Sequence, residues 1–217
     1  KEYIKVYGVL VGKKPLIFTN NDSGYETALE FKKNGIDPII LDTREEHTSE
    51  LIDSAKNQNI KIKFSYAVIA ANGYKKVKSA QIGKLNNDKT AFENSETIEC
   101  DCICVSGFWT PTVHLASQSG NKLKFNDRID AFVPNKSKQN ETSVGASKGT
   151  FTLKETLDDG FKTGFDLSKK ITNNSNATST PNSNETKKNP HDKFWCSPLP
   201  KDKNFKRFVD FQNDVAV

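Results

Sequence analysis

Short apolar runs alternate with segments of helical periodicity in the first third of the chain, and this alternation limits the fold more than any other feature. Apolar runs of strand length occupy residues 14–19, 37–42 and 60–66. Apolar residues at helical spacing occupy 25–34 and 49–58. A β-α-β-α-β order of this kind requires a parallel sheet joined by right-handed crossovers, so we expect an α/β fold of the doubly wound type.

The first predicted helix shows both its buried face and its end. Its apolar side chains are Tyr25, Ala28, Leu29 and Phe31, which fall on one side of a helix. Gly35 follows, and glycine is the usual residue just past a helix end because it adopts the left-handed backbone without strain. The helix is therefore expected to end just before this glycine.

After the third apolar run the pattern changes to strands of antiparallel type. Residues 66–82 and 96–105 read as such strands, and the Asn72-Gly73 pair is a strong hairpin signal. Residues 151–165 then carry apolar side chains at helical spacing. The predicted fold class is therefore α/β, with antiparallel hairpin strands beside a parallel sheet.

The turn after the first strand lies where a dinucleotide-binding unit carries G-x-G-x-x-G. Its three glycine positions hold Thr19, Asn21 and Gly24. Asp42 ends the second strand about 20 residues on, where a ribose-binding carboxylate would lie. An Asn side chain at the second position blocks the approach of the backbone to a pyrophosphate. We interpret this turn as a degenerate dinucleotide site.

The same turn has a purely structural interpretation, which we favour. Asp22 or Ser23 can cap the helix at 25–34, because short polar side chains accept hydrogen bonds from the first helical N–H groups. Asn also tolerates a left-handed backbone, so the tight turn can form without the missing glycines.

A second candidate turn follows a short predicted strand at 131–134. The sequence VGASKGT contains Gly145, Ala146 and Gly149 and precedes the helix predicted at 151–165. Small residues before a helix N-terminus allow a phosphate to approach its free N–H groups. The alternative is that the small residues only permit close packing.

Composition excludes several classes of function. The net charge is +5 and the lysines are dispersed, so nucleic-acid binding is not expected. No run of about 18 apolar residues exists, so no membrane span is predicted. The chain contains no Met and starts at Lys1, which we interpret as a piece of a longer protein. Cysteines expected as reduced thiols in a buried strand are consistent with a cytoplasmic location.

Neither a metal site nor a catalytic residue is predicted. Cys100, Cys102 and Cys104 alternate and are expected on one face of a strand as reduced thiols, whereas zinc sites favour C-x2-C loops. His114 follows a predicted strand and is expected to cap or pack. The Asp158-Asp159 pair is interpreted as a solvated helix face. No G-x-S-x-G sequence exists, which argues against a serine hydrolase.

Several sequence blocks resemble, in order, the alpha subunit of heterotetrameric sarcosine oxidase. They are LIFTNNDSGYETALEF, CDCICVSGFWTPTVHLASQSGNKLKFND, IDAFVPNKS, VGASKGTFTLKETLDDGFKTG and FVDFQNDV. The resemblance covers residues 1–167 and 205–217. It implies a partial, two-unit, Rossmann-like region of the FAD/NAD(P)-binding, glutathione-reductase type.

The resemblance also implies a division of the chain. Residues 1–85 would be an inserted nucleotide-binding-type unit with a degenerate glycine motif, and residues 95–167 the C-terminal return part of the first FAD/NAD-type unit. Residues 168–193, rich in Asn and Ser and almost free of apolar side chains, are expected to form a flexible linker. Residues 194–217 would begin an aminomethyltransferase-like domain that handles folate.

The activity implied by the resemblance is oxidative demethylation of sarcosine to glycine. NAD would be bound by the alpha subunit, FAD by the beta subunit and FMN at the alpha/beta junction of a hetero-oligomer with beta, gamma and delta subunits. Tetrahydrofolate would bind through the downstream domain. The residues expected to line NAD are Gly145, Ala146, Gly149, Thr150, Phe151 and Leu153.

Two other functions fit the same residues. One is a non-catalytic scaffold, in which a degenerate nucleotide-binding fold docks other subunits. The other is a stand-alone FAD/NAD reductase, which would need a glycine-rich strand upstream and no folate-type domain downstream.

Overall fold

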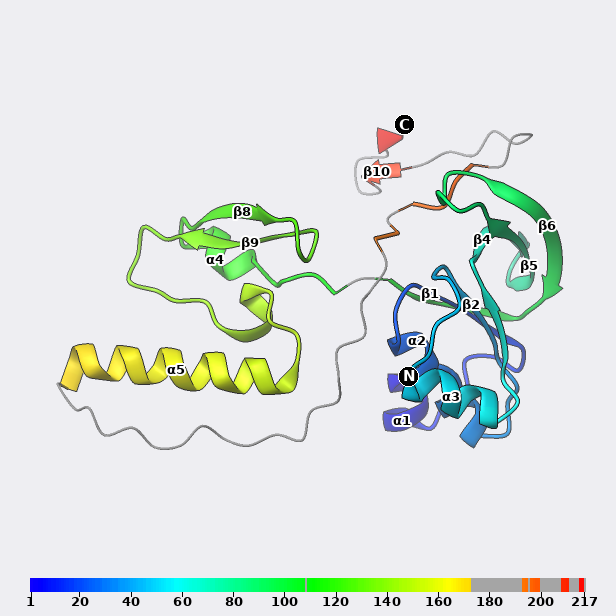
Figure 1. Ribbon diagram of the computed structural model, residues 1–217, viewed down its shortest axis with the longest axis horizontal. Coiled ribbons are helices and arrows are strands. Elements are labelled where there is room, and N and C mark those ends of the chain that lie inside the picture. The colour runs from blue at the N-terminus through cyan, green and yellow to red at the C-terminus, as the bar shows by residue number, and fades with distance from the viewer. Residues whose placement is uncertain (108, 173–192, 195, 200–207, 211–214, 217) are drawn as a thin grey trace. The chain divides into compact units, whose positions relative to one another are not determined.

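The chain folds into two compact units (Figure 1). The computed structural model describes residues 1–107, 109–172, 193–194, 196–199, 208–210 and 215–216. The first unit comprises Lys1–Gly107 with the described residues of Asn189–Val217, and the second lies within Phe108–Lys188. The compact units therefore divide at Gly107, and the antiparallel strands that precede this glycine all lie in the first unit.

A parallel sheet forms the centre of the first unit. It contains β1 (Pro15–Thr19), β2 (Ile39–Asp42), β3 (Lys61–Phe64) and β7 (Cys102–Ser106), in the order β3-β2-β1-β7. In this register Leu16 lies beside Ile39 of β2 and Ile103 of β7. The strands run parallel, as the β-α-β-α-β pattern predicts, and the predicted α/β fold class is confirmed.

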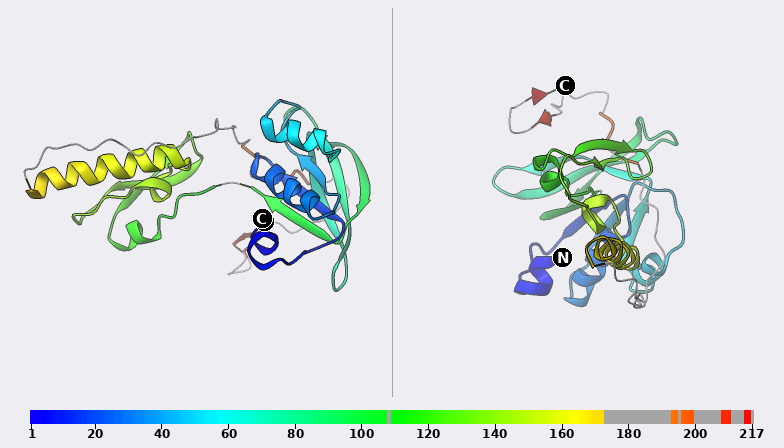
Figure 2. Two further views of the ribbon diagram at one scale, coloured as in Figure 1. Left: turned by 90° about the horizontal axis from the view of Figure 1, so that it is seen from below. Right: turned by 90° about the vertical axis from the view of Figure 1, so that its left-hand side faces the viewer.

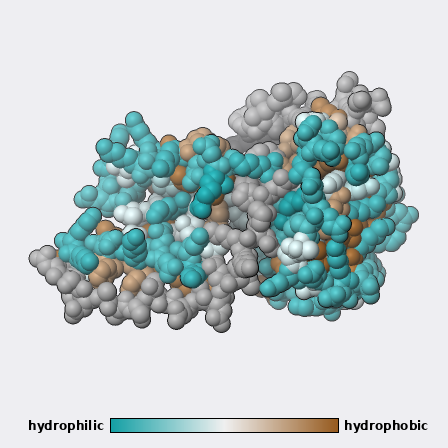
Figure 3. Space-filling model, viewed as in Figure 1, coloured by the Kyte–Doolittle hydropathy of each residue, from teal (hydrophilic) through white to brown (hydrophobic). Residues whose placement is uncertain are grey.

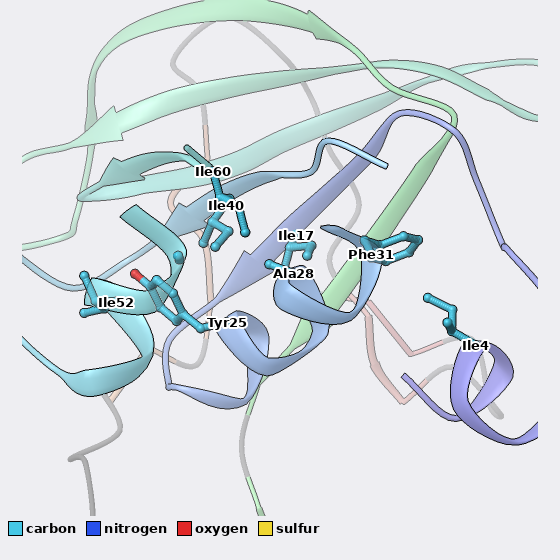
Figure 4. Close-up of a cluster of buried hydrophobic side chains, with 9 residues drawn as sticks. Ile4, Ile17, Tyr25, Ala28, Phe31, Ile40, Ile52 and Ile60 are labelled. Carbon is cyan, nitrogen blue, oxygen red and sulfur yellow. The ribbon is translucent and has the colours of Figure 1, made fainter. Parts of the chain in front are cut away.

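Helices α2 (Ser23–Lys33) and α3 (Glu50–Asn57) pack against one face of this sheet. Tyr25, Ala28 and Phe31 of α2 are fully buried, which confirms the predicted inward face. The core on this side contains Ile4, Ile17, Tyr25, Ala28, Phe31, Ile40, Ile52, Ala55 and Ile60 (Figure 4).

The ends of the helices follow the capping residues of the sequence. After α2 the predicted stop, Gly35, has a φ of 75°, and its N–H donates to the carbonyl of Lys32 at 3.0 Å. The N–H of Ile36 then donates to the carbonyl of Phe31 at 3.1 Å, which completes a Schellman motif. A further short helix, α1 (Glu2–Tyr7), precedes β1.

An antiparallel sheet packs against the opposite face of the parallel sheet, so the unit has three layers (Figure 2). It contains β4 (Tyr66–Gly73), β5 (Val77–Leu85) and β6 (Phe92–Glu99). The interface buries Leu16 and Leu41 against Ile82 of β5. The predicted hairpin at Asn72-Gly73 forms, with three further residues between its strands.

The prediction of one antiparallel strand over 96–105 is wrong. The strand is interrupted at Asp101, and we call this interruption the break. The carboxylate of Asp101 accepts the backbone N–H groups of Lys13 and Lys14 at 2.8 Å each. Before this break β6 pairs antiparallel with β5, and after it β7 pairs parallel with β1. One segment therefore serves two sheets.

Because of this break, the prediction that Cys100, Cys102 and Cys104 share one face of a strand is wrong. Cys102 and Cys104 share a face, with their Sγ atoms 3.7 Å apart, and Cys104 packs against the core beneath the helices. Cys100 lies before the break and belongs to the core between the two sheets. Cys100, Cys102, Cys104 and Cys196 are all free thiols.

The second unit combines a β-hairpin with helices. Its elements are α4 (His114–Gln118), β8 (Lys122–Asn126), β9 (Ala131–Lys136), the 3₁₀ helix η1 (Gly145–Lys148) and α5 (Leu153–Thr172). Strands β8 and β9 pair antiparallel. The core described here is small: Ile129, Ala131 and Val133 are buried, and Phe151 packs against them.

The last helix is longer than the sequence predicts. It was expected over 151–165 but continues to Thr172, so the first residues of the predicted linker at 168–193 are helical. The rest of that linker, residues 173–192, lies outside the described residues. Two short strands near the C-terminus, β10 (Phe208–Asp210) and β11 (Val215–Ala216), pair antiparallel.

Charged side chains form ion pairs within and beside the antiparallel sheet. Lys84 Nζ of β5 lies 2.9 Å from a carboxylate oxygen of Glu93 on β6. Lys63 Nζ of β3, in the parallel sheet, lies 2.6 Å from a carboxylate oxygen of Glu96 on β6. Hydrophilic residues cover much of the face shown in Figure 3. Among the helices described, none is both long enough and apolar enough to cross a membrane.

The contact between α2 and β1 predicts the effect of a substitution at Gly24. A Cβ atom at this position would lie 2.6 Å from Cβ of Thr19, so Gly24→Ala forces the helix away from the strand. We expect a loss of about 1–3 kcal/mol in the free energy of unfolding, measured by urea denaturation followed by circular dichroism. Gly107→Ala is the control, because a Cβ there meets no atom within 4 Å. Equal stability losses in the two variants would contradict the prediction.

Candidate functional site

The two turns singled out in the sequence each precede a helix, and they lie in different units. The first joins β1 to α2 and lies at the carboxyl end of the parallel sheet. In open α/β folds ligands bind at this edge of the sheet. The second joins η1 to α5.

The first turn is held by its own side chains. Thr19 Oγ1 donates to the carbonyl of Asn21 at 2.7 Å and accepts the N–H of Asn21 at 3.2 Å. Asn21 Oδ1 accepts the N–H of Ser23 at 2.9 Å. Thr19 and Asn21 are both buried. The turn thus has a defined conformation although two of the three glycine positions hold other residues.

Side chains of this turn also bind the end of the neighbouring strand β7. Asn21 Nδ2 donates to the carbonyl of Gly107 and, at 2.8 Å, to Oδ1 of Asn20. The hydroxyl groups of Ser23 and Ser106 are hydrogen-bonded to each other. These contacts connect the carboxyl ends of β1 and β7, between which a dinucleotide crosses in folds of this kind.

The predicted capping of α2 by Asp22 or Ser23 is not what the structure shows. Asp22 is the N-cap residue, but its side chain accepts no hydrogen bond from the helix. The acceptor for the N–H of Ser23 is Asn21 Oδ1, one residue earlier than predicted. The carboxylate of Asp22 instead pairs with Arg44, at 2.8 Å from Nη2.

Asp42, the expected ribose-binding carboxylate, is fully buried and already hydrogen-bonded within the protein. It accepts from Tyr25 Oη at 2.7 Å and from Arg44 Nη2 at 2.8 Å. The backbone N–H and Nε of Arg44 also donate to it, both at 3.0 Å. A carboxylate has about four acceptor positions, so few remain for a ribose hydroxyl.

The surroundings of this cluster raise the pKa values of Tyr25 and Arg44. Burial, and then the charge of Asp42, raise the pKa of Tyr25, which keeps its hydroxyl a donor. Burial opposes the positive charge of Arg44, but hydrogen bonds to Asp42 and Asp22 outweigh it and raise the pKa of the guanidinium. Tyr25 is therefore a neutral donor in this cluster, and Arg44 is a charged donor with two carboxyl partners.

The second turn begins and ends with glycines in the left-handed region. Gly145 has a φ of 62° and Gly149 a φ of 96°. A Cβ at Gly145 would lie 2.8 Å from Cγ2 of Thr156, and one at Gly149 would lie 2.7 Å from Cδ1 of Ile129. Both glycines are thus required by backbone conformation and close packing, which is the alternative that the sequence left open.

Much of the hydrogen-bonding capacity of this turn is used internally. The N–H of Thr150 donates to the carbonyl of Gly145 at 3.1 Å, and the N–H of Gly149 donates to that of Ala146 at 3.2 Å. The N–H of Gly145 donates to Asp159 Oδ2 at 2.9 Å. An internal carboxylate thus holds a position at which an anionic ligand could have been bound.

The sequence predicted that Asp159 would lie on a solvated helix face. The structure shows instead that it binds the turn before the helix. Its other oxygen accepts from Lys148 Nζ at 2.8 Å, and the hydrogen bond from Lys148 holds the pKa of Asp159 below its ordinary value of 3.8. Sequence reasoning missed this role because Asp159 lies 14 residues after Gly145.

The first two residues of α5 are exposed. Leu153 and Lys154 are the first two residues of the helix, and their N–H groups have no acceptor within it. Thr152 caps the helix, accepting the N–H of Glu155 at 3.4 Å and donating to its carboxylate at 2.9 Å. The T-x-x-E spacing is a capping-box signal that sequence reasoning could have used.

The predicted NAD-lining residues form one continuous segment, with different exposure. Phe151 packs against the small core of the second unit, and Leu153 is exposed on the first turn of α5. The carbonyl of Thr150 accepts from Thr156 Oγ1 at 3.1 Å.

The histidines in the described residues have no catalytic arrangement around them. Nδ1 of His47 lies 2.8 Å from the carbonyl of Glu45, and its ring packs edge-on to Phe64. His114 is exposed at the first position of α4. Within the ranges that the structure describes, no group of three or more His, Cys, Asp or Glu side chains could hold a metal ion.

The buried contact between Tyr25 and Asp42 predicts that Tyr25→Phe destabilises the first unit. The substitution removes a hydrogen bond to a buried charge, which contributes about 1.5–3 kcal/mol. Chemical denaturation monitored by circular dichroism measures the change. Tyr74→Phe is the matched control, because Tyr74 is 94% exposed and its loss should leave stability unchanged. A Tyr25→Phe chain as stable as the wild type would show that this hydrogen bond is dispensable.

The lowered pKa of Asp159 predicts a pH-dependent contribution to stability. A carboxyl whose pKa is depressed in the folded state stabilises it above about pH 4 and loses that effect as the pH falls through the folded pKa. Asp159→Asn should therefore lower the Tm at neutral pH and have little effect near pH 2. Asp158→Asn is the control at the adjacent position. A Tm loss of the same size at both pH values would mean that the charge of Asp159 is not responsible.

The sequence is similar to curated proteins of one kind. It is 28% identical to sarcosine oxidase subunit alpha of Corynebacterium sp. (strain P-1) over 76% of this chain and 17% of that protein. It is 28% identical to sarcosine oxidase subunit alpha of Rhizobium meliloti (strain 1021) over 100% of this chain and 21% of that protein. The chain thus spans about a fifth of the length of these relatives. No protein-family profile matches it.

Solved structures share the fold at low sequence identity. The flavoprotein disulfide reductase RclA of Escherichia coli superposes with a TM-score of 0.54 and 14% identity, covering 72% of this chain and 36% of that one. 2-Naphthoyl-CoA reductase gives a TM-score of 0.52 and 17% identity, covering 75% of this chain and 22% of that one. The chain therefore has the fold of FAD/NAD(P)-binding reductases, and the resemblance to the alpha subunit of sarcosine oxidase is confirmed.

Proposed function

We propose that this chain is part of the alpha subunit of a sarcosine oxidase-like flavoenzyme, which oxidatively demethylates sarcosine to glycine. The observation that carries the proposal is similarity to sarcosine oxidase alpha subunits over 76–100% of the chain. The flavoprotein-reductase fold supports an oxidoreductase role. The reaction itself is assigned to the whole enzyme, because the described residues contain no catalytic arrangement of their own.

The part played by this chain would be to support NAD binding and subunit assembly. The segment from Gly145 to Leu153 is the proposed contact. The N–H groups of Leu153 and Lys154 point from the start of α5 and suit a phosphate of the dinucleotide, with the Lys154 ammonium adding positive charge. Bound NAD would supply a hydride acceptor. Ala146 is exposed and suits contact with the ligand at the edge of the turn.

The remaining assignments follow from the same similarity. FAD would be bound by the beta subunit and FMN at the alpha/beta junction, and the beta, gamma and delta subunits would be the partners. The inserted unit proposed for residues 1–85 and the return part proposed for 95–167 would together form part of a two-unit nucleotide-binding region. The residues from 194 onward would lead into a domain that binds tetrahydrofolate.

A second function, a non-catalytic scaffold, is favoured by a specific observation in each unit. In the second turn the N–H of Gly145 is bound by Asp159 of the same unit. In the first turn Asp42 is hydrogen-bonded to Tyr25 and Arg44. Both features would suit a nucleotide-type fold that docks other subunits without a ligand of its own.

Substitution of Ala146 by Trp tests the NAD proposal. The side chain is exposed, so an indole should be accommodated by the fold while it covers the approach to the start of α5. Isothermal calorimetry with NAD on the full-length polypeptide should show at least about a tenfold weaker Kd, equivalent to about 1.4 kcal/mol.

Ala71→Trp, at an exposed position near the end of β4, is the control and should bind NAD as the wild type does. Unchanged NAD affinity in the Ala146→Trp polypeptide would contradict the proposed contact. If the wild type itself shows no saturable NAD binding but still assembles with its partner subunits, the scaffold function is supported instead.

A further inference from the structure

We propose that Asn21 and Asp22 close the phosphate position of the first unit, acting as built-in substitutes for a ligand's phosphate groups. The inference concerns residues 1–107 alone and goes beyond the proposed function, which places NAD at the second unit. In this proposal the first unit has a nucleotide-type fold, and two of its own side chains prevent a phosphate from binding at the start of α2.

The location of this closure follows from the sheet. Strands β1 and β7 are parallel neighbours whose carboxyl ends lie at one edge, with Thr19 beside Ser106 in register. Helix α2 begins directly after β1, so its first N–H groups face the same edge. In open α/β folds this is the place where a phosphate meets a helix N-terminus.

Asn21 provides the steric part of the closure. Its Oδ1 accepts the N–H of Ser23, the first residue of α2, at 2.9 Å. Its Nδ2 donates to the carbonyl of Gly107 at the end of β7. One carboxamide therefore occupies a helix-start donor that a phosphate oxygen would use and also bridges the gap between the two strands.

Asp22 provides the electrostatic part. Its carboxylate lies 2.8 Å from Arg44 Nη2, and the same nitrogen lies 2.8 Å from Asp42. Two carboxylates thus surround one guanidinium, which leaves a formal charge of about −1 beside the start of α2. An incoming phosphate would meet this negative charge instead of a guanidinium able to pair with it.

Asp42 determines which ligand a reopened site can take. Its oxygens accept from Tyr25 and from three nitrogen atoms of Arg44, so it is poorly placed to bind a ribose. Removal of the Asn21 and Asp22 side-chain groups would restore donors at Ser23 and Arg44 only. The reopened site should therefore bind the phosphate part of a nucleotide, and inorganic pyrophosphate is the appropriate probe.

The double variant Asn21→Gly/Asp22→Asn of the 217-residue chain tests the closure. Glycine removes the bridging carboxamide, and asparagine keeps the volume of Asp22 while it removes the negative charge. We expect pyrophosphate affinity at least about tenfold above that of the wild type, measured by isothermal calorimetry or phosphorus NMR, with a steep loss of binding at high salt.

The chain provides a matched control, because Asn86-Asn87-Asp88 repeats the Asn-Asn-Asp sequence of residues 20–22 in an exposed turn between β5 and β6. Asn87→Gly/Asp88→Asn makes the same change in composition and charge and should leave pyrophosphate affinity unchanged. An equal gain in both double variants would mean that net charge alone is responsible and would overturn the proposal.

The single variant Asp22→Asn provides a second test in case the double variant does not fold. It preserves side-chain volume and should show a smaller gain in pyrophosphate affinity than the double variant. Circular dichroism establishes that each variant is folded. Pyrophosphate binding at wild-type strength in folded Asp22→Asn and folded double-variant chains would overturn the closure, as would tight binding by the wild type itself.

Discussion

The buried carboxylate of Asp42 is the constraint on which the first unit depends. A charge without solvent must be paired and hydrogen-bonded, or the folded state loses several kcal/mol. Asp42 meets this requirement through Tyr25 on α2 and Arg44 in the loop after β2. Arg44 in turn reaches Asp22 at the start of α2. One charge therefore connects the end of a strand, the neighbouring helix and the turn that leads into that helix.

The two nucleotide-type turns satisfy their polar groups in a similar way. In the first turn Asn21 Oδ1 accepts the N–H of Ser23, and in the second Asp159 accepts the N–H of Gly145. Exposed N–H groups near a helix start need acceptors, and these can come from a ligand or from the protein. Here side chains of the protein supply acceptors in both turns. The fold can thus keep its architecture while side chains of the chain itself satisfy polar groups of these turns.

Local patterns predicted the elements around residues 14–66 because each spans few residues and carries its own signal. The inward face of Tyr25 and Phe31 and the stop at Gly35 follow from helical spacing and backbone preference. The break within 96–105 could not be predicted in this way. It depends on the carboxylate of Asp101 accepting N–H groups from residues almost 90 positions earlier in the chain.

The sequence by itself determined a parallel α/β fold, a degenerate glycine motif and the likeness to sarcosine oxidase alpha subunits. Periodicity depends on residues close in the chain, and the order of the blocks is a property of the sequence itself, so neither requires the folded structure. The tertiary structure alone decided which groups occupy the turns: Arg44 pairs with both Asp22 and Asp42, and Asp159 binds Gly145. Hydrogen bonding acts over about 3 Å in space and carries no fixed separation along the chain, so only the folded arrangement could specify these partners.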